Sequence, residues 1–176
     1  RYVDWNVFAR LDALFLKLYL DEEDLSVVIA IDASASMDWG RPSKWGWARR
    51  LAGALGGVAL AGHHRVTAMT FRADGVSALR DLRGRARTAE LGAWLVDAES
   101  GGQGDLEGAM RTVQRTQRGR GIVIVISDFW EQGDPVGPLQ QLGGAQDLHC
   151  VQVLSPQECD PGAHGLVGDL ALEDAE

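Results

Sequence analysis

The sequence predicts an α/β fold, a Rossmann-like, doubly wound and mostly parallel sheet flanked by helices. Two segments, 25–31 (LSVVIAI) and 121–127 (GIVIVIS), are almost entirely apolar and rich in β-branched residues. Continuous apolar strands of this kind are typical of parallel sheets that are covered on both faces. Strand-like segments alternate along the chain with helices of roughly ten to fifteen residues, and this order indicates parallel strands joined by helical crossovers.

The first 24 residues precede this pattern. We expect a short helix over 3–12 (VDWNVFARLD), followed by a strand over 14–20 (LFLKLYL), which alternates well enough to place Lys17 on a solvated face. The acidic run at 21–24 predicts a turn. We therefore expect residues 1–24 to form a helix and strand that lead into the main domain and pack on it.

The elements of the main domain follow in order, with apolar runs as strands and the longer segments between them as helices. After strand 25–31 we expect a helix over 44–61, strands over 65–71 and 75–82, helices over 86–98 and 106–118, strand 121–127, a helix over 136–143, and strands over 148–154 and 168–172. Gly119 is a candidate cap for the end of helix 106–118. No internal repeat or linker divides residues 25–176, so we expect them to form one domain.

Composition disfavours some classes of partner. The chain has 176 residues, a formal net charge of −8 and a pI near 4.9, whereas nucleic acids and anionic membranes are bound by cationic surfaces. The sequence has no run of about eighteen apolar residues, so we expect no membrane contact by this segment. Cys150 lies in an apolar run and is expected to be a buried thiol. A cytoplasmic location is favoured. The sequence starts at Arg1 and is expected to be a fragment, so membrane association through regions outside it stays open.

Polar side chains follow both of the most apolar strands. Asp32 ends the first and Asp128 follows the second, and Ser34 and Ser36 come shortly after Asp32. Ligands of open α/β sheets bind outside the carboxyl ends of the strands, so we expect the two carboxylates to lie near each other there. A donor set of oxygens without His or Cys suits Mg²⁺ or Mn²⁺ better than zinc. Because hydroxyl ligands are neutral, a cation held this way keeps much of its charge and favours a further carboxylate from outside.

Five blocks of the sequence resemble one family, in the family's order. They are RYVDWNVFAR at the start, IDASASMDWG with the following SKWGWAR, GGQGDLEGAM, VIVISDF, and GDLALEDAE at the end. DASAS is similar to the Asp-x-Ser-x-Ser motif of von Willebrand factor A-like domains, which carry a metal-ion-dependent adhesion site at this strand end. The whole set resembles the bacterial branch called domain of unknown function 58, which is associated with MoxR-type AAA+ ATPases.

The resemblance implies roles for these residues. Ser34 and Ser36 would bind the metal directly, and Asp32 and Asp128 would act directly or through water. It also implies a binding module and not an enzyme. The cation would take an acidic residue of a protein partner as its last ligand, and that partner is expected to be an AAA+ ATPase of the MoxR type or one of its clients.

One position departs from the family pattern. The second metal loop of the family supplies a Thr, in a pattern like Gly-Thr-Asp-Leu, and this sequence has Gly104 at that position. Either water fills the place of the Thr, or Gln103 or Asp105 reaches the metal. Asp105 is therefore a further candidate ligand, with the N-cap of the helix that begins at Leu106 as its alternative role. We expect weaker or altered metal binding.

Three tryptophans, Trp39, Trp45 and Trp47, lie within nine residues just past the first metal loop. Some are expected to pack beneath the loop and others to form a partner surface, since protein interfaces are enriched in Trp. Trp39 and Trp45 are the candidates for partner binding.

Two alternatives stay open. The first is an interaction scaffold without metal, which Gly104 favours. The second is a metal-dependent phosphatase or phosphotransferase with Asp32 as nucleophile. Phosphatases of the haloacid dehalogenase type carry a second Asp two residues after the nucleophile as general acid, and this sequence has Ser34 there. That difference disfavours the enzyme.

Overall fold

The computed structural model describes residues 2–3, 16–17, 25–117, 119–130, 135–144, 146–165 and 168. At its centre lies a five-stranded sheet with the order β5-β4-β3-β6-β7. Its strands are β3 (Ser26–Asp32), β4 (Arg65–Arg72), β5 (Gly75–Arg83), β6 (Gly121–Ser127) and β7 (Asp147–Gln152). All neighbours pair in parallel except β4 and β5, which form an antiparallel hairpin.

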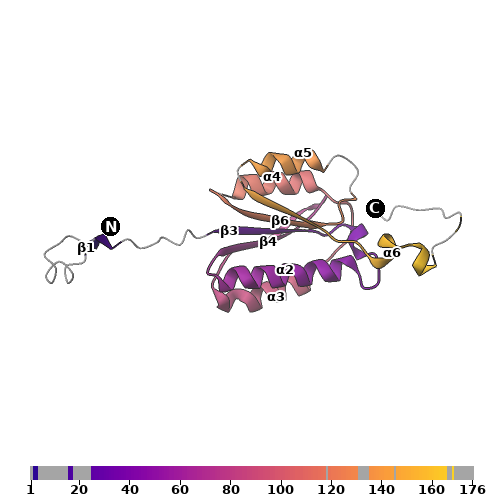
Figure 1. Cartoon of the computed structure of the whole chain (residues 1–176), viewed down its shortest axis with the longest axis horizontal. Coiled ribbons are helices and arrows are strands. Elements are labelled where there is room, and N and C mark those ends of the chain that lie inside the picture. Colours follow the sequence, from indigo (N-terminus) through magenta and orange to yellow (C-terminus); the bar gives the residue numbers. More distant parts are fainter. Residues whose placement is uncertain are drawn as a thin grey trace.

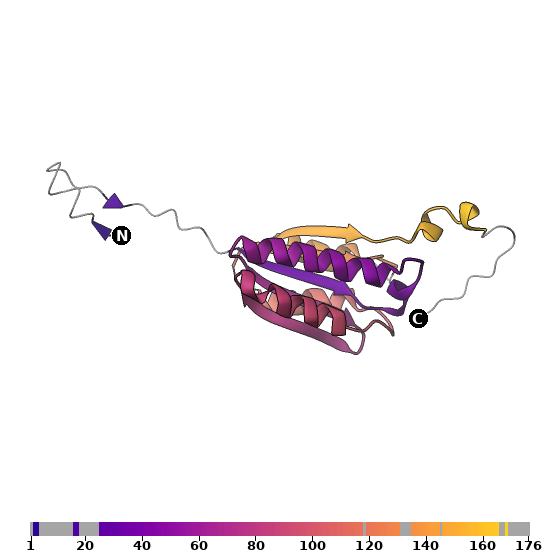
Figure 2. The same cartoon turned by 90° about the horizontal axis from the view of Figure 1, so that it is seen from below.

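Helices cover both faces of this sheet. α2 (Lys44–Ala61) and α3 (Thr88–Asp97) lie on one face, and α4 (Leu106–Thr116) and α5 (Val136–Gly143) lie on the other (Figure 1). Figure 2 shows α2 and α3 side by side along the strands. This arrangement confirms the predicted α/β fold with a mostly parallel sheet flanked by helices.

The central strand β3 contributes to both layers of the core because its side chains alternate between the two faces. Ile29 and Ile31 are fully buried with Trp45 of α2 and Leu91 of α3. On the other face, Val28 and Ala30 lie in a second cluster with residues of α4 and α5. Complete burial of a large aliphatic side chain contributes about 1.5–3 kcal/mol. Burial on both faces is the physical reason for a strand without internal polar residues.

A glycine allows the two helices on one face to approach closely. A Cβ built on Gly56 of α2 would lie 2.4 Å from Cδ2 of Leu91 and 3.5 Å from Cδ1 of Ile29. Gly53 and Gly57, in the same helix, also face residues of α3. The glycine-rich stretch of α2 is therefore a helix-packing feature.

The strands and helices agree with the predicted segments to within a few residues at the ends. Helix α4 ends in a cap at Gln117, whereas Gly119, the predicted cap, has a φ of +78° two residues further on. A short helix that the sequence did not indicate, α6 (Pro156–Cys159), follows β7. Cys150 is exposed. The expectation of a buried thiol is wrong because β7 is an edge strand of the sheet.

At the N-terminus, β1 (Tyr2–Val3) pairs antiparallel with β2 (Leu16–Lys17), and β2 falls inside the predicted strand 14–20. Almost all of the predicted helix 3–12 and of the predicted strand 168–172 lies outside the described residues. The packing of residues 1–24 on the main domain stays a prediction. No helix in the described part of the chain has the length and apolar character that a bilayer crossing requires.

Candidate functional site

The site is built at the carboxyl end of the sheet, where β3 and β6 lie side by side. Asp32 is the last residue of β3, and its side chain is 2% exposed. One of its oxygens, Oδ1, accepts a hydrogen bond from the backbone N–H of Ser34 at 2.9 Å. The other, Oδ2, accepts one from Oγ of Ser127 at 2.6 Å. Asp32 therefore holds the loop after its own strand and also the end of the neighbouring strand.

The two serines of the first loop converge on each other. Ser34 Oγ and Ser36 Oγ lie 3.1 Å apart, within hydrogen-bonding distance. Ser34 is buried and Ser36 is half-buried at the start of a 3₁₀ turn, η1 (Ala35–Asp38). The loop thus brings two hydroxyl oxygens together beside a buried carboxylate.

Asp128 follows β6 and is 1% exposed. Its Oδ1 accepts a hydrogen bond from the backbone N–H of Trp130 at 3.2 Å, and its Oδ2 accepts one from Nζ of Lys44 at 2.7 Å. The ammonium group of Lys44 also donates to Oε1 of Glu158 at 2.6 Å. One buried cation therefore joins Asp128 to a residue of α6.

Glu158 is itself held by the turn in which it lies. Its Oε2 accepts a hydrogen bond from the backbone N–H of Ser155 at 2.6 Å, and its own N–H donates to Oγ of Ser155 at 3.3 Å. This reciprocal pair is a capping box, which satisfies the free N–H groups at the start of α6. Gly40 packs against the same turn, since a Cβ there would lie 2.5 Å from Cβ of Ser155. The short helix is thus fastened to the loop that precedes α2.

The second predicted metal loop also borders the site. The backbone N–H of Ala35 donates to the carbonyl of Gly102, and the N–H of Gly101 donates to the carbonyl of Ala33, both at 2.8 Å. The side chain of Asp105 accepts a hydrogen bond from the N–H of Gly108 at 2.7 Å. Asp105 therefore caps α4, which is the alternative role that the sequence left open for it.

Burial and hydrogen bonding shift the pKa values of two of these carboxylates in opposite directions. Burial raises the pKa of Asp32 above its ordinary value, and the hydrogen bonds from Ser127 and Ser34 offset only part of that effect. Burial acts in the same direction on Glu158. Hydrogen bonds from Lys44 and Ser155 outweigh it and hold the pKa of Glu158 below its ordinary value.

The tryptophans separate into buried and exposed side chains. Trp45 is 4% exposed and belongs to the core, so the expectation that it lies on a partner surface is wrong. Trp45 lies on the inner face of α2, three residues before Ala48, so its indole packs against the sheet. Trp39 and Trp47 are 55% and 53% exposed, and Trp130, which the sequence did not single out, is 65% exposed.

Sequence reasoning assigned no role to three residues that shape the site: Ser127, Lys44 and Glu158. One signal for Lys44 was present. The chain carries 17 basic residues and only two are lysines, and this one lies at the first position of α2. A cation there opposes the helix dipole, so it needs acidic partners. No comparable local pattern marked Glu158.

The donor atoms are consistent with a hard cation held mainly by neutral ligands. Two hydroxyl oxygens converge beside Asp32, and oxygen donors of this kind suit Mg²⁺ and Mn²⁺. Within the described ranges, no three His, Cys, Asp or Glu side chains gather in a way that could hold a metal. A divalent ion at this edge would therefore depend on Ser34 and Ser36.

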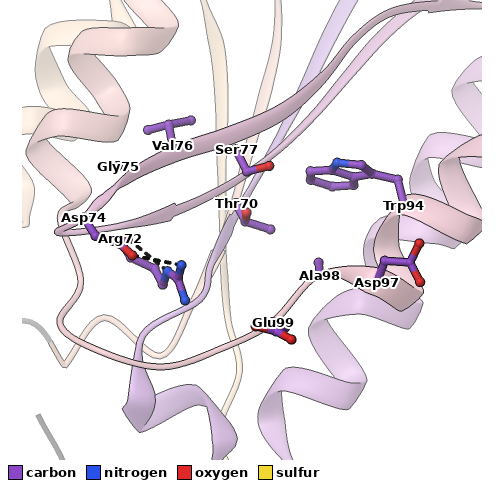
Figure 3. Close-up of a pocket in the computed structure, with 10 residues that line it drawn as sticks. All are labelled: Thr70, Arg72, Asp74, Gly75, Val76, Ser77, Trp94, Asp97, Ala98 and Glu99. Carbon is purple, nitrogen blue, oxygen red and sulfur yellow. Dashed lines mark hydrogen bonds and ion pairs between the residues drawn. The ribbon is translucent and has the colours of Figure 1, made fainter.

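A separate hollow lies between the β4–β5 hairpin and the end of α3. It has a volume of about 440 Å³ and is lined by residues that include Thr70, Trp94 and Glu99. Figure 3 shows the ion pair of Arg72 with Asp74 on its strand side and Trp94 on its helix side. None of the predicted site residues lines this cavity.

The whole chain, residues 1–176, matches the model of one family, described as protein of unknown function DUF58. The chain belongs to the DUF58 family. It is 27% identical over 181 residues to the uncharacterised protein Rv1480 of Mycobacterium tuberculosis, an alignment that covers 100% of this chain and 56% of that protein. The uncharacterised protein MAV169 of Mycobacterium avium is 30% identical over 112 residues, which cover 64% of this chain and 59% of the relative. This DUF58 chain thus spans little more than half the length of these relatives.

Solved structures place the DUF58 chain among von Willebrand factor A-like folds. A von Willebrand factor type A protein from Catenulispora acidiphila has a TM-score of 0.52 and 19% identity over 72% of this chain and 32% of its own. The manganese-loaded TRAP protein of Plasmodium vivax has a TM-score of 0.56 and 14% identity, covering 85% and 65%. An aerotolerance-related membrane protein of Bacteroides fragilis has a TM-score of 0.57 and 20% identity, over 73% of this chain and 67% of its own. At these identities the likeness shows the fold alone.

Proposed function

We propose that this DUF58 domain is a protein-binding module whose contact with its partner depends on a divalent metal ion. The observation that carries the proposal is the pair of hydroxyls of Ser34 and Ser36, 3.1 Å apart at the carboxyl end of the sheet and beside the buried Asp32. Ser34 and Ser36 would hold Mg²⁺ or Mn²⁺. Asp32 would orient the loop through its hydrogen bonds to Ser34 and Ser127.

The bound ion would supply an open position for a carboxylate of the partner, because its neutral hydroxyl ligands leave most of its charge uncompensated. The manganese in a structural neighbour supports the proposal, since that protein shares the fold. The partner is proposed to be a MoxR-type AAA+ ATPase or one of its clients, on the family resemblance of the motifs. The exposed indoles of Trp39 and Trp130 follow the two site loops directly and would add apolar contact area around the carboxylate.

The proposal does not include catalysis by this domain. A phosphatase mechanism with Asp32 as nucleophile needs a general acid, and Ser34, two residues after Asp32, cannot fill that role. The side chain of Asp32 is also 2% exposed, which leaves little access for a phosphate ester. We further propose that the domain acts in the cytoplasm, with membrane association through regions outside this sequence as the alternative.

One observation favours a second candidate, an interaction scaffold without metal. Asp128 already pairs with the ammonium group of Lys44, and Gly104 offers no hydroxyl where the family pattern has a Thr. In that case the same loops and the exposed Trp39 and Trp130 would form a contact surface that does not respond to chelators.

Calorimetric titration of Mn²⁺ and Mg²⁺ into the purified chain tests the proposal. We expect saturable binding by the native protein and its loss in the double variant Ser34→Ala/Ser36→Ala. Ser77→Ala is the matched control, because Ser77 is an exposed serine on β5 outside the site. Identical heats for the native protein and the double variant would exclude the metal site. A pull-down with and without chelator, followed by identification of a co-eluting ATPase, then separates the metal-dependent module from the metal-free scaffold.

A further inference from the structure

The most unusual side chain of this domain is Lys44, which is fully buried although it carries a charge. Its side chain is 1% exposed, as is that of Asp128, and its Nζ lies 2.7 Å from Oδ2 of Asp128. Its second partner, Glu158, is 20% exposed and lies 2.6 Å from the same nitrogen. Lysines are almost never buried completely unless they are paired. The two carboxylates therefore hold this ammonium group inside the protein.

The pairing has a consequence for Asp128. Its Oδ2 receives the ammonium group of Lys44, and its Oδ1 receives the N–H of Trp130. The negative charge of Asp128 is thus compensated within the protein. Asp32 differs, because its hydrogen bonds come from the neutral groups of Ser34 and Ser127. Of the two buried carboxylates at this edge, only Asp128 has a cation as its partner in the described structure.

We infer that Lys44 is a resident cation of the site, which neutralises Asp128 and keeps this carboxylate out of the set of metal ligands. A divalent ion would then be held by Ser34 and Ser36 with the help of Asp32 alone. Lys44 lowers the affinity for the ion because it occupies Asp128, a carboxylate that would otherwise be free to serve as a ligand. This inference rests on the proposed metal-dependent function. It departs from the motif, which predicts that Asp128 serves the metal.

Glu158 completes the arrangement. If Asp128 were the only partner of Lys44, the ion pair could break when a metal ion binds nearby, and Asp128 could then turn to the metal. The capping box fixes Glu158 to the backbone of Ser155, and Glu158 in turn fixes the other side of the ammonium group. Lys44 is thereby a positioning residue with two anchors, one on the loop after β6 and one on α6.

Mn²⁺ titrations of the native chain and of three variants test the inference. Lys44→Met releases Asp128, so we expect tighter Mn²⁺ binding by about tenfold, within the range by which groups next to metal ligands alter affinity. Asp128→Asn is expected to weaken binding by less than about tenfold, the smallest loss typical of a residue that orients a metal ligand, because the charge of Asp128 is already compensated by Lys44. The double variant Lys44→Met/Asp128→Asn is expected to lose the tenfold gain. Arg50→Met is the control, since Arg50 is an exposed cation on the same helix.

The outcomes separate the inference from the proposed function. Saturable binding by the native chain that weakens tenfold or more in Asp128→Asn overturns the inference alone, because Asp128 is then a ligand. Binding by Lys44→Met but not by the native chain supports the inference and contradicts the proposed function. Binding by none of the proteins overturns both. If circular dichroism shows that Lys44→Met does not fold, the affinity of Asp128→Asn decides the matter by itself.

Discussion

Ser127 donates its hydroxyl to Asp32 across 95 positions of the sequence, at a distance of 2.6 Å. The same Ser127 oxygen accepts the backbone N–H of Phe129 at 2.8 Å. This one hydroxyl therefore links the carboxylate at the end of β3 to the loop that carries Asp128. The two halves of the site are held together directly, in addition to the strand pairing of β3 with β6.

Replacing Ser127 by Ala is expected to lower the free energy of unfolding by about 1–3 kcal/mol, because it leaves a buried carboxylate oxygen without its donor. Urea denaturation of the native chain and the variant measures the change. The exposed Ser77→Ala serves as control and is expected to stay within about 0.5 kcal/mol of the native protein. Equal stability of Ser127→Ala and the native chain would show that this hydrogen bond is dispensable.

Gly104→Thr is expected to strengthen Mn²⁺ binding, since it restores the hydroxyl that the family pattern has in the second loop. Gly104→Ala is the matched control, because it adds a Cβ without an oxygen. Calorimetry should give a gain for Thr and none for Ala. An equal effect of both would assign the change to the backbone instead of the hydroxyl.

Substitution of two neighbouring glycines of α2 by alanine is expected to change the free energy of unfolding in opposite directions. A Cβ at Gly56 would lie 2.4 Å from Cδ2 of the buried Leu91, whereas one at Gly57 meets nothing closer than Cγ2 of Thr88 at 3.6 Å. Overpacking costs about 1–3 kcal/mol, and alanine gains about 1 kcal/mol over glycine inside a helix. Thermal and urea unfolding should show Gly56→Ala less stable and Gly57→Ala more stable than the native chain. The reverse order would contradict the close packing of α2 on α3.

The contribution of Glu158 to stability is expected to depend on pH. Its pKa lies below the ordinary value of 4.5, so the folded state favours the carboxylate. The stabilisation is fully present above pH 4.5 and is lost as the pH falls through the lower folded-state value. At pH 7 we expect Glu158→Gln to be less stable by about 1–2 kcal/mol, and the difference should shrink toward pH 3. Glu107→Gln, at an exposed position of α4, is the control. A constant difference for Glu158→Gln at all pH values would argue against the ion pair with Lys44.

Local patterns were sufficient to predict the centre of the fold. Strands β3 and β6 are buried on both faces, and such burial requires the continuous apolar, β-branched runs that mark them in the sequence. Asp32 and Asp128 could be placed at one edge for the same reason, since parallel neighbours end on the same side. For the outer strand β7 the hydrophobic pattern was ambiguous. The strand that contains Cys150 is apolar enough to resemble an inner one, and only the sheet order shows that it lies outside.

Other features depend on contacts that no local pattern records. Lys44 and Glu158 are 114 positions apart, and their pairing depends on where the short helix α6 folds back. Trp45 was within reach of sequence reasoning. It precedes Ala48 and Ala52 by three and seven residues, the spacing of one helical face, and all three are buried together. Trp47 lies off that face and is exposed, so helical phase separates the two indoles.

The fastening of α6 to Lys44 also bears on how this domain forms during synthesis. The ribosome makes the chain from the N-terminus, and domains fold as their segments emerge. Asp32, Ser34 and Ser36 emerge early, but the strand that brings Ser127 beside them comes almost a hundred residues later, and Glu158 later still. Until residue 158 has left the exit tunnel, the ammonium group of Lys44 lacks one of its two partners. A nascent chain therefore completes the site at the carboxyl end of the sheet only when most of the domain has been made. A protein that binds the incomplete site could do so only before residue 158 has emerged.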